Sequence, residues 1–137
     1  MCGIYGFAGF DEPGLLGRMS DRLRHRGPDG VGRWERPGLS MGMRRLSIID
    51  IEGGQQPIFN EDKSLVLCQN GELYNYVELR EELQRLGHVF ATRSDTEVTI
   101  HAYEQWGVDC LARLNGMFAF ALYDGVRRRL FLARDRC

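Results

Sequence analysis

The second residue of the chain, Cys2, can supply a nucleophile and a base together once Met1 is removed. Its thiol can attack a carbonyl carbon, and its own α-amine, with a reference pKa of about 7.7 to 8.0, can accept the proton near neutral pH. No second residue then has to be positioned as the base. The alternative is that Cys2 is a small residue that merely follows the initiator methionine, and the residue alone leaves both interpretations open.

The dipeptide Asn70-Gly71 offers two hydrogen-bond donors side by side. The Asn side-chain amide and the adjacent Gly N–H can converge on one oxygen, as stabilisation of an oxyanion requires. The same dipeptide is typical of a hairpin turn or a helix C-cap, because both residues accept positive φ. Taken alone, it therefore leaves a catalytic and a purely structural role open.

Three charged residues, Arg45, Glu72 and Asp95, fall at the ends of expected strands or the starts of expected helices. Side chains from separate elements can meet at such places. One cation and two anions suit a zwitterionic amino acid, with the Arg paired to the carboxylate and the two carboxylates near the ammonium group. The alternative is that all three are ordinary surface charges.

The other three cysteines, Cys68, Cys110 and Cys137, form no C-x-x-C pair and have no histidine cluster beside them in the sequence. This spacing predicts no zinc site. In a reducing compartment these residues are expected to be free thiols, most of them buried as small hydrophobic side chains.

The elements that must position these residues alternate between strands and helices. In the first half of the chain, apolar runs and turn residues predict four elements and a loop: a strand over 3–10, a helix from Leu15 to the Gly27-Pro28 break, strands over 31–36 and 38–43, and a loop over 52–63.

The second half repeats this alternation. It predicts a strand over 64–69, a helix from Asn75 to Gly87, a strand over 88–93, a helix from Ser94 to Gly107, a short helix over 108–114, and strands over 116–124 and 128–134. Asn75 with Glu78, and Ser94 with Glu97, have capping-box spacing. Helices between antiparallel strand pairs indicate a layered α+β domain.

Length and composition narrow the class of protein. The chain has 137 residues, of which 43% are hydrophobic and 27% charged, as expected of one globular domain. A net charge of −1 does not favour nucleic acid or an anionic membrane as the partner. No apolar run approaches the roughly 20 residues of a membrane span, and no secretory pattern is present. We expect a cytoplasmic protein that acts on a small molecule or another protein.

Several runs of residues, in this order, resemble one known family: MCGIYGF at the start, RHRGPDG at 24–30, RRLSIID at 44–50, QNGELYNYVELR at 69–80, TRSDTEV at 92–98, LNGMFAFALYD at 114–124 and LFLARDR at 130–136. The chain resembles the class II, N-terminal-nucleophile glutamine amidotransferase domain, specifically that of glutamine-hydrolysing asparagine synthetases. The resemblance covers essentially the whole chain. Amidotransferases of purine or glucosamine phosphate synthesis share the N-terminal Cys and the Asn-Gly pair but look less similar in the other runs.

The resemblance implies a role for each candidate residue. Cys2 attacks the side-chain amide carbon of glutamine, and Asn70 and Gly71 stabilise the oxyanion. The substrate itself is held by these two residues and by Arg45 at its carboxylate, Glu72 and Asp95 near its ammonium group, and the main chain around Ile48. Family members usually carry His where this chain has Met43, and we expect that difference to alter packing or loop shape rather than the nucleophile.

The resemblance also implies a fold and a domain organisation. The expected fold is a four-layer αββα sandwich of antiparallel sheets, with residues 1–137 forming an amidotransferase domain that lacks its final strands. An ATP-dependent synthetase domain is not present in this sequence. We expect no cofactor and no metal in this domain, since ATP and Mg²⁺ would belong to the synthetase domain. The expected partners are glutamine and a synthetase domain or chain, and a homo-oligomer stays open.

Two kinds of function are compatible with the sequence. The first is a glutaminase that releases ammonia for transfer to an activated aspartate, or to another acceptor as in related amidating enzymes. The second is an inactive, truncated remnant that binds glutamine or a partner without turnover.

Overall fold

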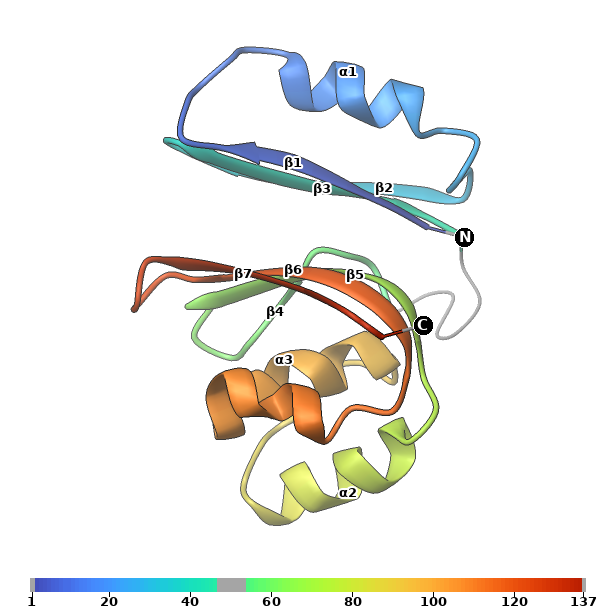
Figure 1. Cartoon of the computed structure of the whole chain (residues 1–137), viewed down its shortest axis with the longest axis vertical. Helices are drawn as coiled ribbons and strands as arrows, with labels where there is room; N and C mark the ends of the chain where they lie inside the picture. The colour runs from blue at the N-terminus through green and yellow to red at the C-terminus, as the bar shows by residue number, and fades with distance from the viewer. Residues whose placement is uncertain (1, 47–53, 137) are drawn as a thin grey trace.

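The chain folds into four layers in the order helix, sheet, sheet, helices (Figure 1). The computed structural model describes residues 2–46 and 54–136. The predicted α+β sandwich with two antiparallel sheets is confirmed. None of the described helices has the length and apolar run that a membrane crossing requires.

The first sheet contains β1 (Gly3–Ala8), β2 (Gly30–Arg36) and β3 (Leu39–Arg45), in the spatial order β1-β3-β2. Both strand pairs are antiparallel. β2 and β3 form a hairpin whose turn contains Pro37 and Gly38, and Gly38 has a φ of 76° that glycine adopts without strain. Helix α1 (Leu15–Arg22) covers the outer face of this sheet (Figure 1).

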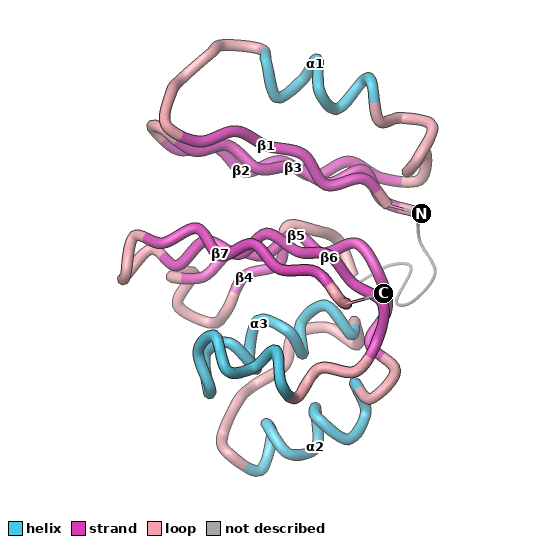
Figure 2. The backbone as a smooth tube through the Cα atoms, in the orientation of Figure 1, coloured by secondary structure: helices cyan, strands magenta, loops and turns pink. Residues whose placement is uncertain are grey.

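The second sheet is ordered β4-β5-β6-β7, also antiparallel throughout. Its strands are β4 (Ile58–Phe59), β5 (Leu65–Leu73), β6 (Gly116–Asp124) and β7 (Arg129–Arg134). On the outer side of this sheet, α3 (Asp95–Trp106) packs against β5, and α2 (Tyr76–Arg85) packs against α3 and lies farther from the sheet (Figure 2). The short 3₁₀ helix η1 (Gly107–Ala112) follows α3 and packs against it.

Strand β5 separates two hydrophobic cores because its side chains alternate between the two faces of the sheet. Val66 and Cys68 face the first sheet and pack in a cluster with β3 residues. Leu65 and Leu67 face the helices and pack with residues of α2 and α3. One strand that is buried on both faces therefore runs through the centre of the molecule.

Met43 is one of the residues in the core between the sheets. It is fully buried in a cluster with Met41, Val66 and Cys68, and Cys2 packs against the edge of that cluster. The expected packing role for Met43 agrees with this position. Cys68 and Cys110 are buried free thiols, as predicted. Cys137 lies outside the described residues.

The predicted strand over 88–93 is wrong, because side chains rather than a neighbouring strand bind its main chain. The Glu97 carboxylate accepts hydrogen bonds from Ala91 N and Thr92 N, each at 2.7 Å. Arg80 donates to Thr92 O at 2.8 Å. Glu97 is therefore used to hold this segment and does not complete the predicted capping box at Ser94.

Other boundaries differ from the sequence prediction in smaller ways. The region 52–63, predicted as a loop, contains the two-residue strand β4. Helix α1 ends at Arg22, five residues before Gly27. Asn75 precedes α2 as predicted but makes no capping hydrogen bond, since its side chain bonds Arg113 O and Asn115 N instead.

Candidate functional site

One pocket of about 440 Å³ collects the predicted site residues that the structure describes. Cys2 directly precedes β1, and the others come from the end of β3, the last part of β5 and the start of α3: Arg45, Asn70, Gly71, Glu72 and Asp95. Positions from both sheets and from a helix thus meet at one end of the sandwich. Ile48, the remaining predicted substrate contact, lies outside the described residues.

Cys2 is half-buried at the edge of the core between the sheets. Its Sγ accepts a hydrogen bond from Leu46 N at 3.2 Å, and Arg26 Nε donates to Cys2 O at 3.1 Å. These contacts fix both the thiol and the main chain of the residue beside the pocket. Burial raises the pKa of Cys68 to about 12 and that of Cys110 to about 11, which disfavours a thiolate at either position.

Asn70-Gly71 is not a turn, so the structural alternative for this dipeptide is wrong. Both residues lie within β5, opposite Ala119 and Phe118 of β6. Gly71 has a φ of 136°, and a Cβ there would lie 2.0 Å from Met117 O. Only glycine fits this position, because any side chain would collide with the main chain of β6.

The side of β5 to which the Gly71 N–H points follows from the alternation of hydrogen bonds along the strand. Phe118 lies opposite Gly71. Its N–H donates to Asp135 Oδ2 and its carbonyl accepts from Asp135 N, so both groups point to the side of β6 that faces away from β5. The neighbours of Gly71 on the same edge, Gln69 and Leu73, donate away from β6 to side chains. Because alternate residues of an antiparallel strand point their polar groups to the same side, the Gly71 N–H is left outside the ladder between β5 and β6.

The three charged residues that the sequence predicted for the pocket are buried or half-buried. Arg45 and Asp95 are each 5% exposed, and Glu72 is half-buried. Asp95 Oδ2 accepts from Leu73 N at 2.9 Å, which joins the end of β5 to the start of α3. Ser94, directly before it, caps α3 by accepting from Thr96 N. The interpretation of Arg45 and Asp95 as ordinary surface charges is therefore wrong.

The pKa of Asp95 is raised above its ordinary value. Burial is the main cause, and the nearby charge of Glu72 adds to it, while hydrogen bonds from Leu73 N and from the start of α3 act in the opposite direction. A buried, ionised carboxylate is stabilised by a cationic partner, because the cation compensates for the hydration that the carboxylate has lost.

Gln56 also lines the pocket, although it belongs to none of the motifs named above. Its side-chain amide pairs with the main chain of Gln69 as a strand would, donating to Gln69 O at 2.9 Å and accepting from Gln69 N. The Gln69 side chain in turn accepts from Thr99 Oγ1 at 2.7 Å. This buried network fixes β5 immediately before Asn70.

Asp135 is a second pocket residue to which the sequence assigned no role. Its Oδ2 accepts from Phe118 N at 2.7 Å, and its own N–H donates to Phe118 O at 2.9 Å. It thereby holds β6 opposite Gly71. Its place in the run LFLARDR was the only sequence signal that could have found it.

Comparison with known proteins agrees with this geometry. A family model described as a glutamine amidotransferase domain matches residues 1–137. The glutamine-hydrolyzing asparagine synthetase 3 of Bacillus subtilis (strain 168) is 46% identical to the chain over 143 residues, which cover 99% of the chain and 23% of that relative. The corresponding asparagine synthetase 1 of Arabidopsis thaliana is 43% identical, covering 98% of the chain and 24% of the relative. The chain spans about a quarter of the length of these relatives.

Solved structures share the fold. The glutamine phosphoribosylpyrophosphate amidotransferase of B. subtilis, in complex with ADP and GMP, superimposes with a TM-score of 0.78 at 22% identity, over 98% of the chain and 37% of that protein. A structure described as the allosteric regulatory enzyme of purine biosynthesis gives a TM-score of 0.79 at 23% identity. At this level of identity the likeness shows a common fold alone.

The resemblance noted from the sequence motifs is confirmed by the family model and by the asparagine synthetases that match nearly the whole chain. The αββα sandwich agrees with the fold of the solved amidotransferase structure. The chain belongs to the glutamine amidotransferase domain family.

Proposed function

We propose that this chain hydrolyses glutamine to glutamate and ammonia, as the glutaminase portion of an enzyme like the glutamine-hydrolysing asparagine synthetases. The observation that carries the proposal is the gathering of Cys2, Arg45, Asn70-Gly71, Glu72 and Asp95 around one pocket. A nucleophile, two oxyanion donors and charges for both ends of an amino acid are present together, and the main-chain fold fixes each of them.

The reaction starts at Cys2. After removal of Met1, the α-amine takes the thiol proton and Sγ attacks the side-chain amide carbon of glutamine, which gives a tetrahedral intermediate. The carbon–nitrogen bond then breaks, the leaving nitrogen takes the proton from the α-ammonium group, and ammonia departs from a thioester. Water attacks the thioester carbon, releasing glutamate and restoring the thiol.

The negative oxygen of the tetrahedral intermediate is stabilised by Asn70 and Gly71. The Gly71 N–H is suited to this role because it lies outside the hydrogen-bond ladder between β5 and β6. Each donor of this kind contributes about 3 kcal/mol to the transition state in acyl-transfer enzymes.

Selection of glutamine depends on the charged residues of the pocket. Arg45 pairs with the substrate carboxylate, and Asp95 and Glu72 bind the ammonium group. Binding of an ammonium group also offsets the cost of keeping Asp95 buried and ionised. The main chain around Ile48 completes the pocket in this proposal.

The product ammonia is consumed by a synthetase module, on the same or another chain, that forms an amide from an activated aspartate. The names of the curated relatives support this acceptor, since they are asparagine synthetases. Hydrolysis itself needs no cofactor in this scheme, and ATP and Mg²⁺ are used by the synthetase module. We place the protein in the cytoplasm, where the described cysteines stay as free thiols.

A glutamate-release assay with purified protein tests the proposal. We expect release by the wild type and none above background from Cys2→Ala, while Cys110→Ala serves as the matched control because Cys110 packs with the helices away from the pocket. Mass spectrometry of the same samples should show that Met1 is absent from the active protein. Equal activity of the wild type and Cys2→Ala, or activity with Met1 retained, would contradict the proposed role of Cys2.

A further inference from the structure

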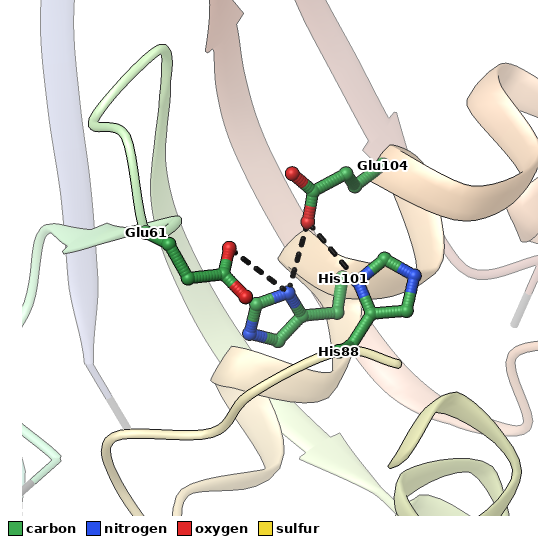
Figure 3. A group of neighbouring side chains, drawn as sticks. All are labelled: Glu61, His88, His101 and Glu104. Carbon is green, nitrogen blue, oxygen red and sulfur yellow. Dashed lines mark hydrogen bonds and ion pairs between the residues drawn. The ribbon is translucent and has the colours of Figure 1, made fainter. Parts of the chain in front are cut away.

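A second group of polar side chains lies on the helix side of the second sheet, separate from the residues that line the glutamine pocket (Figure 3). His101 and Glu104 come from α3, His88 follows the end of α2, and Glu61 follows β4. Three segments that are distant in the sequence therefore direct two imidazoles and two carboxylates toward one point.

The distances within this group are those of ligands around one small metal ion. Glu104 Oε2 lies 3.0 Å from His101 Nδ1 and 3.2 Å from His88 Nδ1. Glu61 Oε2 lies 4.0 Å from His101 Nδ1, and one ligand atom from each residue falls within 4.8 Å of all the others. Ligands bound tetrahedrally to Zn²⁺ at about 2.0–2.1 Å are separated by about 3.3 Å.

The second nitrogen of each imidazole already faces an oxygen. His88 Nε2 lies at hydrogen-bond distance from Gln105 Oε1, 2.9 Å. His101 Nε2 makes no hydrogen bond within the described residues, but Glu97 Oε1 lies 3.6 Å from it. A neutral imidazole carries one proton, so placing that proton on Nε2 leaves a lone pair on Nδ1. Histidines that bind metals are commonly oriented in this way, by a carboxylate or another acceptor at the second nitrogen.

The negative charges around His101 are a second observation that favours a bound cation. Its side chain is only 1% exposed, yet the carboxylates of Glu61, Glu97 and Glu104 all lie within 4.0 Å of its ring nitrogens. Three carboxylates around a buried ring make a strongly negative site, which a divalent cation would neutralise.

We propose that Glu61, His88, His101 and Glu104 bind one Zn²⁺ ion in a structural site. Two nitrogen and two oxygen ligands suit zinc, and four protein ligands leave no open position for substrate or water. The sequence predicted no zinc site, because its cysteines lack zinc-ligand spacing. The four proposed ligands come together only when α3 packs near β4 and the segment after α2.

The ion would join the segments after β4 and after α2 to the middle of α3. His101 lies six residues after Asp95 on the same helix, about 9 Å along its axis. The proposed site therefore stabilises the helix that presents Asp95 to the glutamine pocket, without contacting the substrate. It is independent of whether the chain hydrolyses glutamine.

Calorimetric titration of metal-free, untagged protein with ZnCl₂ at neutral pH tests the proposal. We expect saturation at one ion per chain, and a rise in Tm when zinc is added. His88→Ala and Glu61→Gln should each weaken binding at least about tenfold. The matched controls are His25→Ala and Glu78→Gln, two exposed positions outside the group, which should bind zinc as the wild type does.

Cobalt provides a second readout that reports ligand geometry. Co²⁺ in a tetrahedral site absorbs visible light far more strongly than hydrated Co²⁺, and added zinc should abolish this absorption by displacement. Glu61 is 46% exposed, so Glu61→Gln is expected to stay folded even if His88→Ala does not. Equal zinc affinity of Glu61→Gln and the wild type, or no saturable binding by the wild type, would overturn the proposal.

Discussion

At the scale of single residues, the proposed glutamine pocket depends on groups whose ionisation or main-chain conformation the fold has altered. Asp95 is removed from water at the start of α3 and is held by Leu73 N. Its carboxylate is costly to keep ionised, and a substrate ammonium group is the partner that offsets this cost. The charge of Glu72 on β5 increases the cost of ionising Asp95 and also the attraction of the pocket for a cation.

The raised pKa of Asp95 predicts a pH dependence for glutamine binding. The ionised form binds the ammonium group and predominates above this pKa, so KM should rise as the pH falls, starting at a higher pH than for an ordinary Asp. Asp95→Asn should show a higher KM, by about tenfold or more, with a much flatter profile over the same acidic range. Steady-state kinetics between neutral and acidic pH measures this.

The same variant tests the assignment through stability. An acidic group whose folded pKa is raised destabilises the folded state above that pKa, where it must be ionised. Asp95→Asn is therefore expected to have an unchanged or higher Tm at neutral pH, since an Asn oxygen can still accept from Leu73 N. A low KM that persists in Asp95→Asn would contradict the role of this residue in substrate binding.

At the scale of elements, β5 and α2 show how the fold supports the pocket. β5 is buried on both faces and contains Asn70-Gly71 near its end, so its register determines where the proposed oxyanion donors lie. A one-residue slip in such a strand would exchange its two faces. α2 packs against α3 and contributes the fully buried Leu83 to the helix-side core.

Gly71→Ala should disrupt the strand at the pocket. The added Cβ would meet Met117 O at 2.0 Å and the positive φ would remain, so we expect a loss of about 3 kcal/mol in unfolding free energy together with loss of glutaminase activity. Gly87→Ala is the matched control, because Gly87 also has a positive φ, of 100°, but no atom lies within 4 Å of an added Cβ. Denaturant unfolding should show a clearly smaller loss there, about 1–2 kcal/mol, with activity retained.

Leu83→Ala should destabilise the helix-side core. Leu83 is fully buried in α2, and truncation there leaves a cavity that costs about 2–5 kcal/mol. Leu86 follows the same helix and is 52% exposed, so Leu86→Ala should change the unfolding free energy by less than about 0.5 kcal/mol. Similar denaturation midpoints for the two variants would show that α2 is not packed as described.

At the scale of the whole molecule, local patterns predicted the elements better than the contacts between them. The alternation of Phe118 and Phe120 and the Pro37-Gly38 turn depend on neighbouring residues, and the corresponding strands formed as expected. The segment 88–93 did not form a strand, because the distant Glu97 binds its main chain. Local propensity cannot show such a bond.

The site residues show the same contrast between what local patterns predict and what long-range contacts determine. The residue types of Cys2 and Asn70-Gly71 already indicate their chemistry in the sequence, and in the structure these residues line one pocket. Gln56 could not be found from the sequence, because its role is to pair with a strand 13 residues away. The Glu61, His88, His101 and Glu104 group was missed for the same reason, since its members meet only after the helices pack.

The central claim is that Cys2 is the nucleophile of a glutamine pocket, and covalent labelling with a chloroketone analogue of glutamine tests it most directly. The analogue is added to purified protein with and without excess glutamine, and the modified peptide is located by mass spectrometry. We predict one adduct, on Cys2, that glutamine prevents from forming. Labelling of Cys68 or Cys110 instead, or labelling of Cys2 that excess glutamine does not reduce, would contradict the account.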